Sequence, residues 1–157
     1  MNAKLVAAIL AATTAASAVL CGCGGTAAMT QGGVWDRGGP YPVHRATRLI
    51  TIDKHPHRDQ WAGATVIRDW VQPVSGAPAT ERTQVQMLWD MNNLYVRFVA
   101  ADADLTAPLP RRDDPIYTED VVELFLVPYP DKPFYYEFEV NPIGTVMALE
   151  IPGLKEK

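Results

Sequence analysis

The sequence predicts an all-β protein whose strands form an antiparallel β-sandwich. From residue 48 onward, short runs rich in Val, Ile, Leu, Phe and Tyr are separated by turn residues, and several runs alternate between apolar and polar side chains. A period of two is typical of strands. No segment keeps a helical period over three turns, and 13 prolines disfavour long helices. Short strands at this spacing indicate two packed antiparallel sheets.

The first predicted elements are a strand and a β-hairpin. Residues 49–52 are mostly β-branched and end at Asp53, which predicts the first strand. Residues 83–89 and 94–101 both alternate, and between them lies the turn sequence Asp90-Met91-Asn92-Asn93. Two alternating runs around an Asp/Asn-rich turn predict a hairpin.

Three further strands are predicted in the C-terminal part. Residues 121–127 form an apolar run that only Glu123 interrupts, which is typical of a central strand covered on both faces. Residues 134–140 alternate again, and the turn that follows them leads into a last strand at residues 145–151. The apolar members of the clearest strands are expected in the core: Val96, Phe98, Val122, Leu124, Leu126, Tyr136 and Phe138.

The N-terminal segment predicts export. Lys4 precedes residues 5–20, which contain neither a charge nor a proline. This run is too short for the ~20 apolar residues of a membrane-spanning helix. The sequence Leu20-Cys21-Gly22-Cys23 then resembles the bacterial lipobox, which implies that Cys23 becomes the lipid-carrying first residue. The alternative is an ordinary signal peptide with incidental cysteines, but both cysteines of the chain fall in this window. We therefore expect an exported lipoprotein, anchored to a membrane of the cell envelope.

These features divide the chain into a signal peptide at residues 1–22, a Gly/Pro-rich tether at residues 23–47 and a β-sandwich at residues 48–157. Glycine-rich segments lose much entropy on ordering, so the tether is expected to be flexible. The formal net charge is -4 and there is no basic run. A nucleic-acid partner is therefore not expected, because phosphate binding needs clustered Lys and Arg.

Four sequence blocks occur in the order of a known family. They are Ile50-Thr51-Ile52-Asp53 with Trp61, Val85-Gln86-Met87-Leu88-Trp89-Asp90 with Asn93-Leu94-Tyr95-Val96, Tyr117-Thr118-Glu119-Asp120-Val121-Val122-Glu123-Leu124-Phe125, and Tyr135-Tyr136-Glu137-Phe138-Glu139-Val140-Asn141-Pro142. Together they resemble the family 9 carbohydrate-binding modules, over about residues 48–151. The resemblance implies an immunoglobulin-like sandwich that binds β-linked poly- or oligosaccharides, such as xylan or cellulose fragments. It implies binding without catalysis, beside glycoside hydrolases.

The chain departs from the family's pattern at three places. Lys54, His55 and His57 lie where the family has a glycine and an acidic residue ahead of Trp61. Tyr117 stands where the family has a binding-site tryptophan. The family's later strands, which carry a second sugar-stacking aromatic residue, do not follow, so the sandwich is expected to be incomplete at its C-terminus.

Tyr117 and Glu123 are the first two predicted sugar-binding residues. An exposed aromatic ring stacks on the apolar face of a sugar, and Tyr117 follows a polar, proline-containing loop where exposure is expected. The alternative is a tyrosine packed on the rim of the sandwich. Glu123 is a carboxylate within an apolar strand, so it requires a partner. That partner is a sugar hydroxyl, or alternatively an arginine such as Arg97, Arg111 or Arg112.

Glu139 is the third predicted sugar-binding residue, at a position where family members often carry a sugar-contacting arginine. The alternative for Glu137 and Glu139 is a solvated face, the commoner outcome for alternating charges on a strand. A glycosidase pair formed by either of them with Glu123 is not predicted, because nothing in the sequence singles out two carboxyl groups at the separation that glycoside hydrolysis needs.

No metal or other cofactor is predicted. His55 and His57 flank a proline in a loop, whereas zinc sites need three or four ligands. The alternative is Ca²⁺, held by loop carboxylates at Asp102, Asp104, Asp113 or Asp114.

Two other function classes remain open. One is a haem-binding sandwich that uses Met87 or Met91 as a ligand. The other is a structural or protein-docking lipoprotein with no small ligand.

Overall fold

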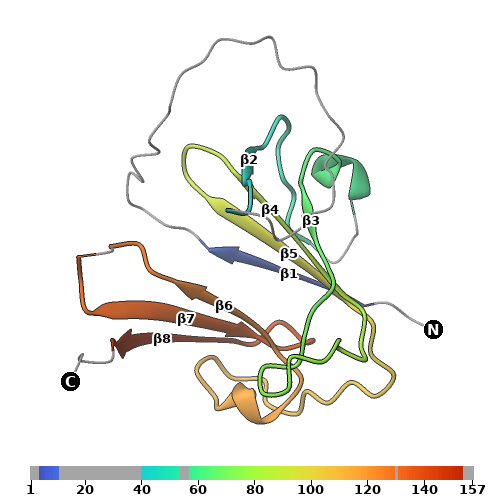
Figure 1. Ribbon diagram of the computed structural model, residues 1–157, viewed down its shortest axis with the longest axis vertical. Coiled ribbons are helices and arrows are strands. Elements are labelled where there is room, and N and C mark those ends of the chain that lie inside the picture. Colours follow the sequence, from blue (N-terminus) through green and yellow to red (C-terminus); the bar gives the residue numbers. More distant parts are fainter. Residues whose placement is uncertain (1–3, 11–39, 54–56, 130, 154–157) are drawn as a thin grey trace. The chain divides into compact units, whose positions relative to one another are not determined.

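The computed structural model describes residues 4–10, 40–53, 57–129 and 131–153. Over these residues the regular structure is eight strands and two short 3-10 helices, so the predicted all-β class is confirmed. The chain divides into two compact units, Met1–Asp102 and Ala103–Lys157, and each contains one sheet (Figure 1). Two sheets of this kind are the components of a β-sandwich. Among the described residues, no helix is both long and apolar enough to cross a membrane.

The sheet of the first unit has the strand order β1-β5-β4-β2, with β3 also paired to β4. The bounds are β1 (Lys4–Leu10), β2 (His44–Arg45), β3 (Val66–Ile67), β4 (Thr83–Trp89) and β5 (Leu94–Ala100). All pairings are antiparallel except that of the two-residue β2 with β4, which is parallel. The predicted hairpin is therefore confirmed, with Trp89 opposite Leu94 at its closed end.

Hydrogen bonds to Asp90 close this hairpin. Its Oδ1 accepts the backbone N–H groups of Asn92 and Asn93, both at 2.8 Å. Its Oδ2 accepts the hydroxyl of Tyr95 at 2.7 Å. These bonds, that of Tyr95 foremost, hold the pKa of Asp90 below its ordinary value. A short Asp/Asn turn thus sets the register of two seven-residue strands.

The predicted strand at residues 49–52 is wrong, although Ile50 from this segment is buried in the core. The backbone N–H of Thr51 donates to Oε1 of Gln60 at 2.9 Å, and Nε2 of Gln60 donates to the Thr51 hydroxyl at 3.3 Å. A side chain from the 3-10 helix η1 (Arg58–Trp61) therefore replaces the neighbouring strand. The core cluster of this unit consists of Ile50, Trp61, Ala64, Leu88 and Tyr95.

Part of the predicted signal peptide and tether is described by the structure. Residues 4–10 form β1, which pairs with β5 from Lys4 opposite Ala100 to Leu10 opposite Leu94. At the end of the tether, residues 40–47 belong to the first unit rather than to a free spacer. There the hydroxyl of Tyr41 bonds to the carbonyl of Thr65 and accepts the N–H of Met87 at 3.2 Å. Cys23 and the remaining predicted signal and tether residues lie outside the described residues.

The second unit contains a three-stranded antiparallel meander in the order β6-β7-β8. Its strands are β6 (Val122–Leu126), β7 (Phe134–Val140) and β8 (Val146–Pro152), close to the three predicted ranges. In the described part of the chain β6 pairs with β7 alone, so it is an edge strand and not the predicted central one. Phe125 is accordingly 52% exposed.

The predicted core residues of the first unit are buried, whereas those of the second unit are only partly buried. Val96 and Phe98 are buried on β5. The members expected in the second unit are half-buried: Val122, Leu124, Leu126, Tyr136 and Phe138. They share one face of the meander, where the rings of Phe134, Tyr136 and Phe138 follow one another at centroid distances of 5.5 and 6.3 Å.

Candidate functional site

Hydrogen bonds to two carboxylates at its C-terminal end fix the loop at residues 106–120, which precedes β6. Oδ2 of Asp120 accepts the backbone N–H of Thr106 at 2.7 Å, and the N–H of Asp120 donates to the Thr106 carbonyl at 3.2 Å. Oε1 of Glu119 accepts the N–H of Leu109 at 2.8 Å. The two ends of the loop are therefore joined side by side.

Asn141 connects this loop to the turn between β7 and β8. It is fully buried, and its Nδ2 donates to the carbonyl of Leu109 at 3.1 Å and to Oε2 of Glu119 at 3.2 Å. Its Oδ1 accepts the N–H groups of Ile143 at 3.2 Å and Thr145 at 2.8 Å. The side-chain amide of Asn141 thus makes four hydrogen bonds, which uses both of its N–H donors and both lone pairs of its oxygen.

Tyr117 lies on the 3-10 helix η2 (Ile116–Thr118) within this pinned loop. The preceding Ile116 is fully buried, while Tyr117 is 61% exposed. The hydroxyl of Thr118 donates to the carbonyl of Pro115 at 3.0 Å and closes the turn. The chain then bends at Glu119 and Asp120 before β6 begins. The ring of Tyr117 is therefore exposed on a backbone whose position is fixed by its neighbours.

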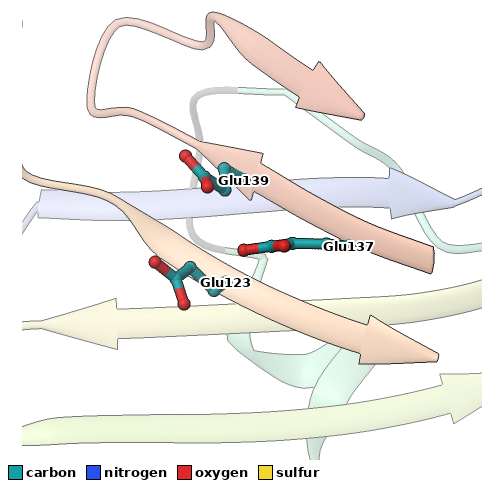
Figure 2. Close-up of side chains that lie close together, drawn as sticks. All are labelled: Glu123, Glu137 and Glu139. Carbon is teal, nitrogen blue, oxygen red and sulfur yellow. The ribbon is translucent and has the colours of Figure 1, made fainter. Parts of the chain in front are cut away.

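Glu123, Glu137 and Glu139 come together on one face of the meander (Figure 2). Glu123 on β6 lies directly opposite Glu139 on β7, and Glu137 lies two residues before Glu139, on the same side of the strand. Ligand atoms from the three carboxylates all lie within 4.8 Å of one another. We call these three residues the glutamate cluster.

Burial dominates the electrostatics of the glutamate cluster. Glu139 is only 2% exposed, whereas Glu123 is exposed and Glu137 half-buried. Burial foremost, and then the carboxylates of Glu123 and Glu137, together raise the pKa of Glu139 from 4.5 to about 7. The buried Met147 lies opposite Glu139 on β8. The solvated face considered from the sequence is therefore wrong for Glu139.

The arginines considered as partners of Glu123 are engaged elsewhere. Arg111 pairs with Asp114 at 3.4 Å, and Arg112 pairs with Asp113 at 3.4 Å. Arg97 donates to Gln86 at 3.0 Å within the first unit. Over the described residues, no ion pair to Glu123 is found.

The residues considered as metal ligands have other contacts where the structure describes them. Oδ1 of Asp113 accepts the N–H of Ala148 at 3.3 Å, and Oδ2 of Asp114 accepts the N–H of Arg111 at 3.1 Å. His57 Nε2 lies 3.0 Å from Asp53 Oδ2, and His55 is outside the described residues.

The structure brings Glu123 and Glu139 together and places Tyr117 at the same end of the second unit. Tyr117 precedes β6, Glu123 lies near the start of β6, and Glu139 lies near the end of β7, against which η2 packs. The sequence did not single out Glu137 as a member of the group. The signal available was its spacing of two residues from Glu139, which puts both carboxylates on one face of a strand.

Comparison with known proteins matches the chain to one family model. The model describes a carbohydrate family 9 binding domain-like module and matches residues 52–145, from the first unit into the second. Neither the curated proteins nor the solved structures contain a significant match. The matched segment covers more than half of the 157 residues and includes Tyr117, Glu123 and Glu139. The chain therefore belongs to the carbohydrate family 9 binding domain-like family, whose general function is the binding of carbohydrate.

Proposed function

We propose that this protein binds poly- or oligosaccharide without catalysing its breakdown, and that Tyr117 is the residue on which the sugar stacks. The observation that carries the proposal is the 61% exposure of Tyr117 on a loop fixed by part-buried hydrogen bonds. Sugars present apolar C–H faces, and an aromatic ring that is already held in place stacks on them with little loss of conformational entropy.

In this proposal the exposed Glu123 supplies the polar contact to the sugar, and the buried Glu139 is its partner on the adjacent strand. Glu123 is exposed, so its carboxylate is accessible to sugar hydroxyls as a strong, charged hydrogen-bond acceptor. Glu139 on β7 pairs directly with Glu123 in the strand register, and its side chain is buried. Ligand sites combine an apolar or aromatic surface with a small number of placed polar groups, and Tyr117 with Glu123 provides that combination.

The sequence supports a proposed ligand class and a proposed cellular setting. The resemblance to family 9 modules favours β-linked sugars of the xylan or cellulose type, near glycoside hydrolases that degrade them. The lipobox-like sequence ending at Cys23 favours an exported protein that is held at the cell envelope by a lipid anchor. The proposed role is to keep a polysaccharide close to the envelope while other proteins cleave it.

Calorimetric titration with xylo- and cello-oligosaccharides tests the proposal. The parent protein should bind at least one of the two series. Tyr117→Ala should lose about 1–3 kcal/mol of binding free energy, which is the range for a base stacked on an aromatic platform and corresponds to about 5- to 150-fold in affinity. The matched control is Tyr129→Ala, which removes a tyrosine at the far end of β6, where the ring packs against Phe134.

Two results would contradict the proposal. Equal losses in Tyr117→Ala and Tyr129→Ala would show that the effect is on folding rather than on the sugar contact. Absence of binding by the parent protein to both oligosaccharide series would reject the assigned ligand class.

A further inference from the structure

The glutamate cluster concentrates negative charge at one point of the meander. Glu123 and Glu139 are direct cross-strand neighbours, and like charges in that arrangement destabilise a sheet. Glu137 adds a third carboxylate, so that ligand atoms from all three lie within 4.8 Å of one another. The charged groups that act on Glu139 are Glu123 and Glu137, both of the same sign. The arrangement therefore requires compensation by a positive charge or by protons.

One oxygen of Glu139 is buried and has no partner. The side chain is 2% exposed, and Oε2 makes no hydrogen bond to any protein group. A buried carboxylate oxygen without a partner is costly, and such orphaned atoms are rare in folded proteins. In Figure 2 the carboxylate of Glu139 points to the same side of the sheet as those of Glu123 and Glu137. The orphaned oxygen thus belongs to the group of carboxylates that a ligand would bridge.

The donor atoms of the cluster define the class of ligand. All are carboxylate oxygens, which are hard donors that prefer hard divalent cations to soft metals. Ca²⁺ binds oxygens at about 2.3–2.6 Å, so two of its ligands lie up to about 5 Å apart. Mg²⁺ at about 2.0–2.1 Å allows only about 4 Å and demands regular octahedral geometry. The oxygens of the cluster all lie within 4.8 Å of one another, which is inside the span that Ca²⁺ allows.

We propose that Glu123, Glu137 and Glu139 form a binding site for a divalent cation of the calcium type. Glu139 supplies the buried base of the site, and the exposed Glu123 lies on the side from which the ion enters. Three carboxylates provide up to six oxygens, and water completes the coordination shell. The inference concerns cation binding alone and does not depend on sugar binding.

The competing explanation is that a proton, rather than a cation, compensates the charge. Ligand atoms of Glu139 and Glu137 lie within 4.8 Å of each other, and two neighbouring carboxyl groups can share a hydrogen bond when one of them is protonated. A proton and a cation make different predictions at high pH, where the carboxyl groups are ionised. A cation site then gains affinity, whereas a site that only holds a proton binds nothing.

Titration of Ca²⁺ alone into chelator-treated, full-length protein at pH 8 separates these explanations. The parent should bind about one Ca²⁺ per chain and show a higher Tm in its presence. Glu123→Gln and Glu137→Gln should each weaken binding by at least about tenfold, because each removes a charged ligand. Glu123 is exposed, so its variant should fold normally.

Glu150→Gln is the matched control. It makes the same change in charge on β8, but Glu150 lies opposite Tyr136 and therefore on the other face of the meander. It should bind Ca²⁺ as the parent does. The proposal is overturned if the parent shows no Ca²⁺ binding at millimolar concentration. It is also overturned if Glu123→Gln and Glu150→Gln bind with the same affinity as the parent.

Discussion

Glu139 makes the stability of the protein depend on pH in a direction opposite to that of most carboxyl groups. Its pKa rises from 4.5 to about 7 because the side chain is buried and lies beside Glu123 and Glu137. At pH values between 4.5 and about 7, Glu139 is therefore mostly protonated in the folded state and mostly ionised in the unfolded chain. Stability from this group is fully present below pH 4.5 and falls as the pH rises through about 7.

The size of the effect follows from the shift. The difference between 4.5 and about 7 is about 2.5 pKa units, and one unit corresponds to about 1.4 kcal/mol. Glu139 is 2% exposed, so solvent screening reduces this value little. We expect the free energy of unfolding to lose about 3 kcal/mol from this residue between pH 4.5 and pH 8.5. Glu139→Gln has no proton to lose and should escape this loss.

Urea unfolding of the parent and Glu139→Gln across this pH range, in the presence of a chelator, measures the prediction. The difference between the two stability curves isolates Glu139 from the other groups that titrate. Glu150→Gln is the control for the loss of one negative charge on the same sheet. If the curves of the parent and Glu139→Gln run parallel from pH 4.5 to pH 8.5, the reasoning from burial and like charge is refuted.

Three further predictions concern the anchor, the core and the loop. Cys23→Ala should abolish lipid labelling and release the protein from membranes; a variant that is still acylated and membrane-bound would contradict the lipobox assignment. Ile116→Ala removes a fully buried side chain and should cost about 2–5 kcal/mol in urea unfolding, more than Leu124→Ala at a half-buried position; a larger cost for Leu124→Ala would contradict this order. Asn141→Ala removes four hydrogen bonds and leaves the buried N–H of Thr145 unsatisfied, at about 1–3 kcal/mol for such a group, and should weaken sugar binding through the loop that carries Tyr117; a small stability change with unaltered affinity would show that other contacts hold the loop.

The sequence predicted those elements that local patterns determine. The hairpin was predictable because both strands alternate and Asp90 provides the bonds that its turn needs. The segment at residues 49–52 has an equally good strand composition, yet Gln60 takes the backbone hydrogen bond of Thr51. That bond joins residues nine positions apart and leaves no trace in the pattern of the segment itself. Composition therefore did not predict the backbone conformation of this segment, in which Ile50 is a core residue.

Burial in the second unit was harder to predict than its strands. The apolar run around Leu124 predicts a central strand. In the described part of the chain β6 pairs with β7 alone, so it is an edge strand, and Val122, Leu124 and Leu126 are half-buried. On β7 the alternation correctly separates Glu137 and Glu139 from Tyr136 and Phe138. Which of these two faces is more covered depends on tertiary packing, and for Glu139 the charged side is buried.

The pairing of Glu123 with Glu139 explains why the glutamate cluster needs a proton or a cation to compensate its negative charge. The resemblance to the family implies that an arginine often occupies the position of Glu139. Here a carboxylate stands in place of the cation, directly opposite another carboxylate and beside Glu137. Such a group is stable only if a proton or a cation joins it. A protonated Glu139 can donate a hydrogen bond to a sugar, whereas a bound cation can coordinate sugar hydroxyls directly. Urea unfolding with a chelator present and the Ca²⁺ titration distinguish the two, because the first measures the proton on Glu139 and the second measures the cation.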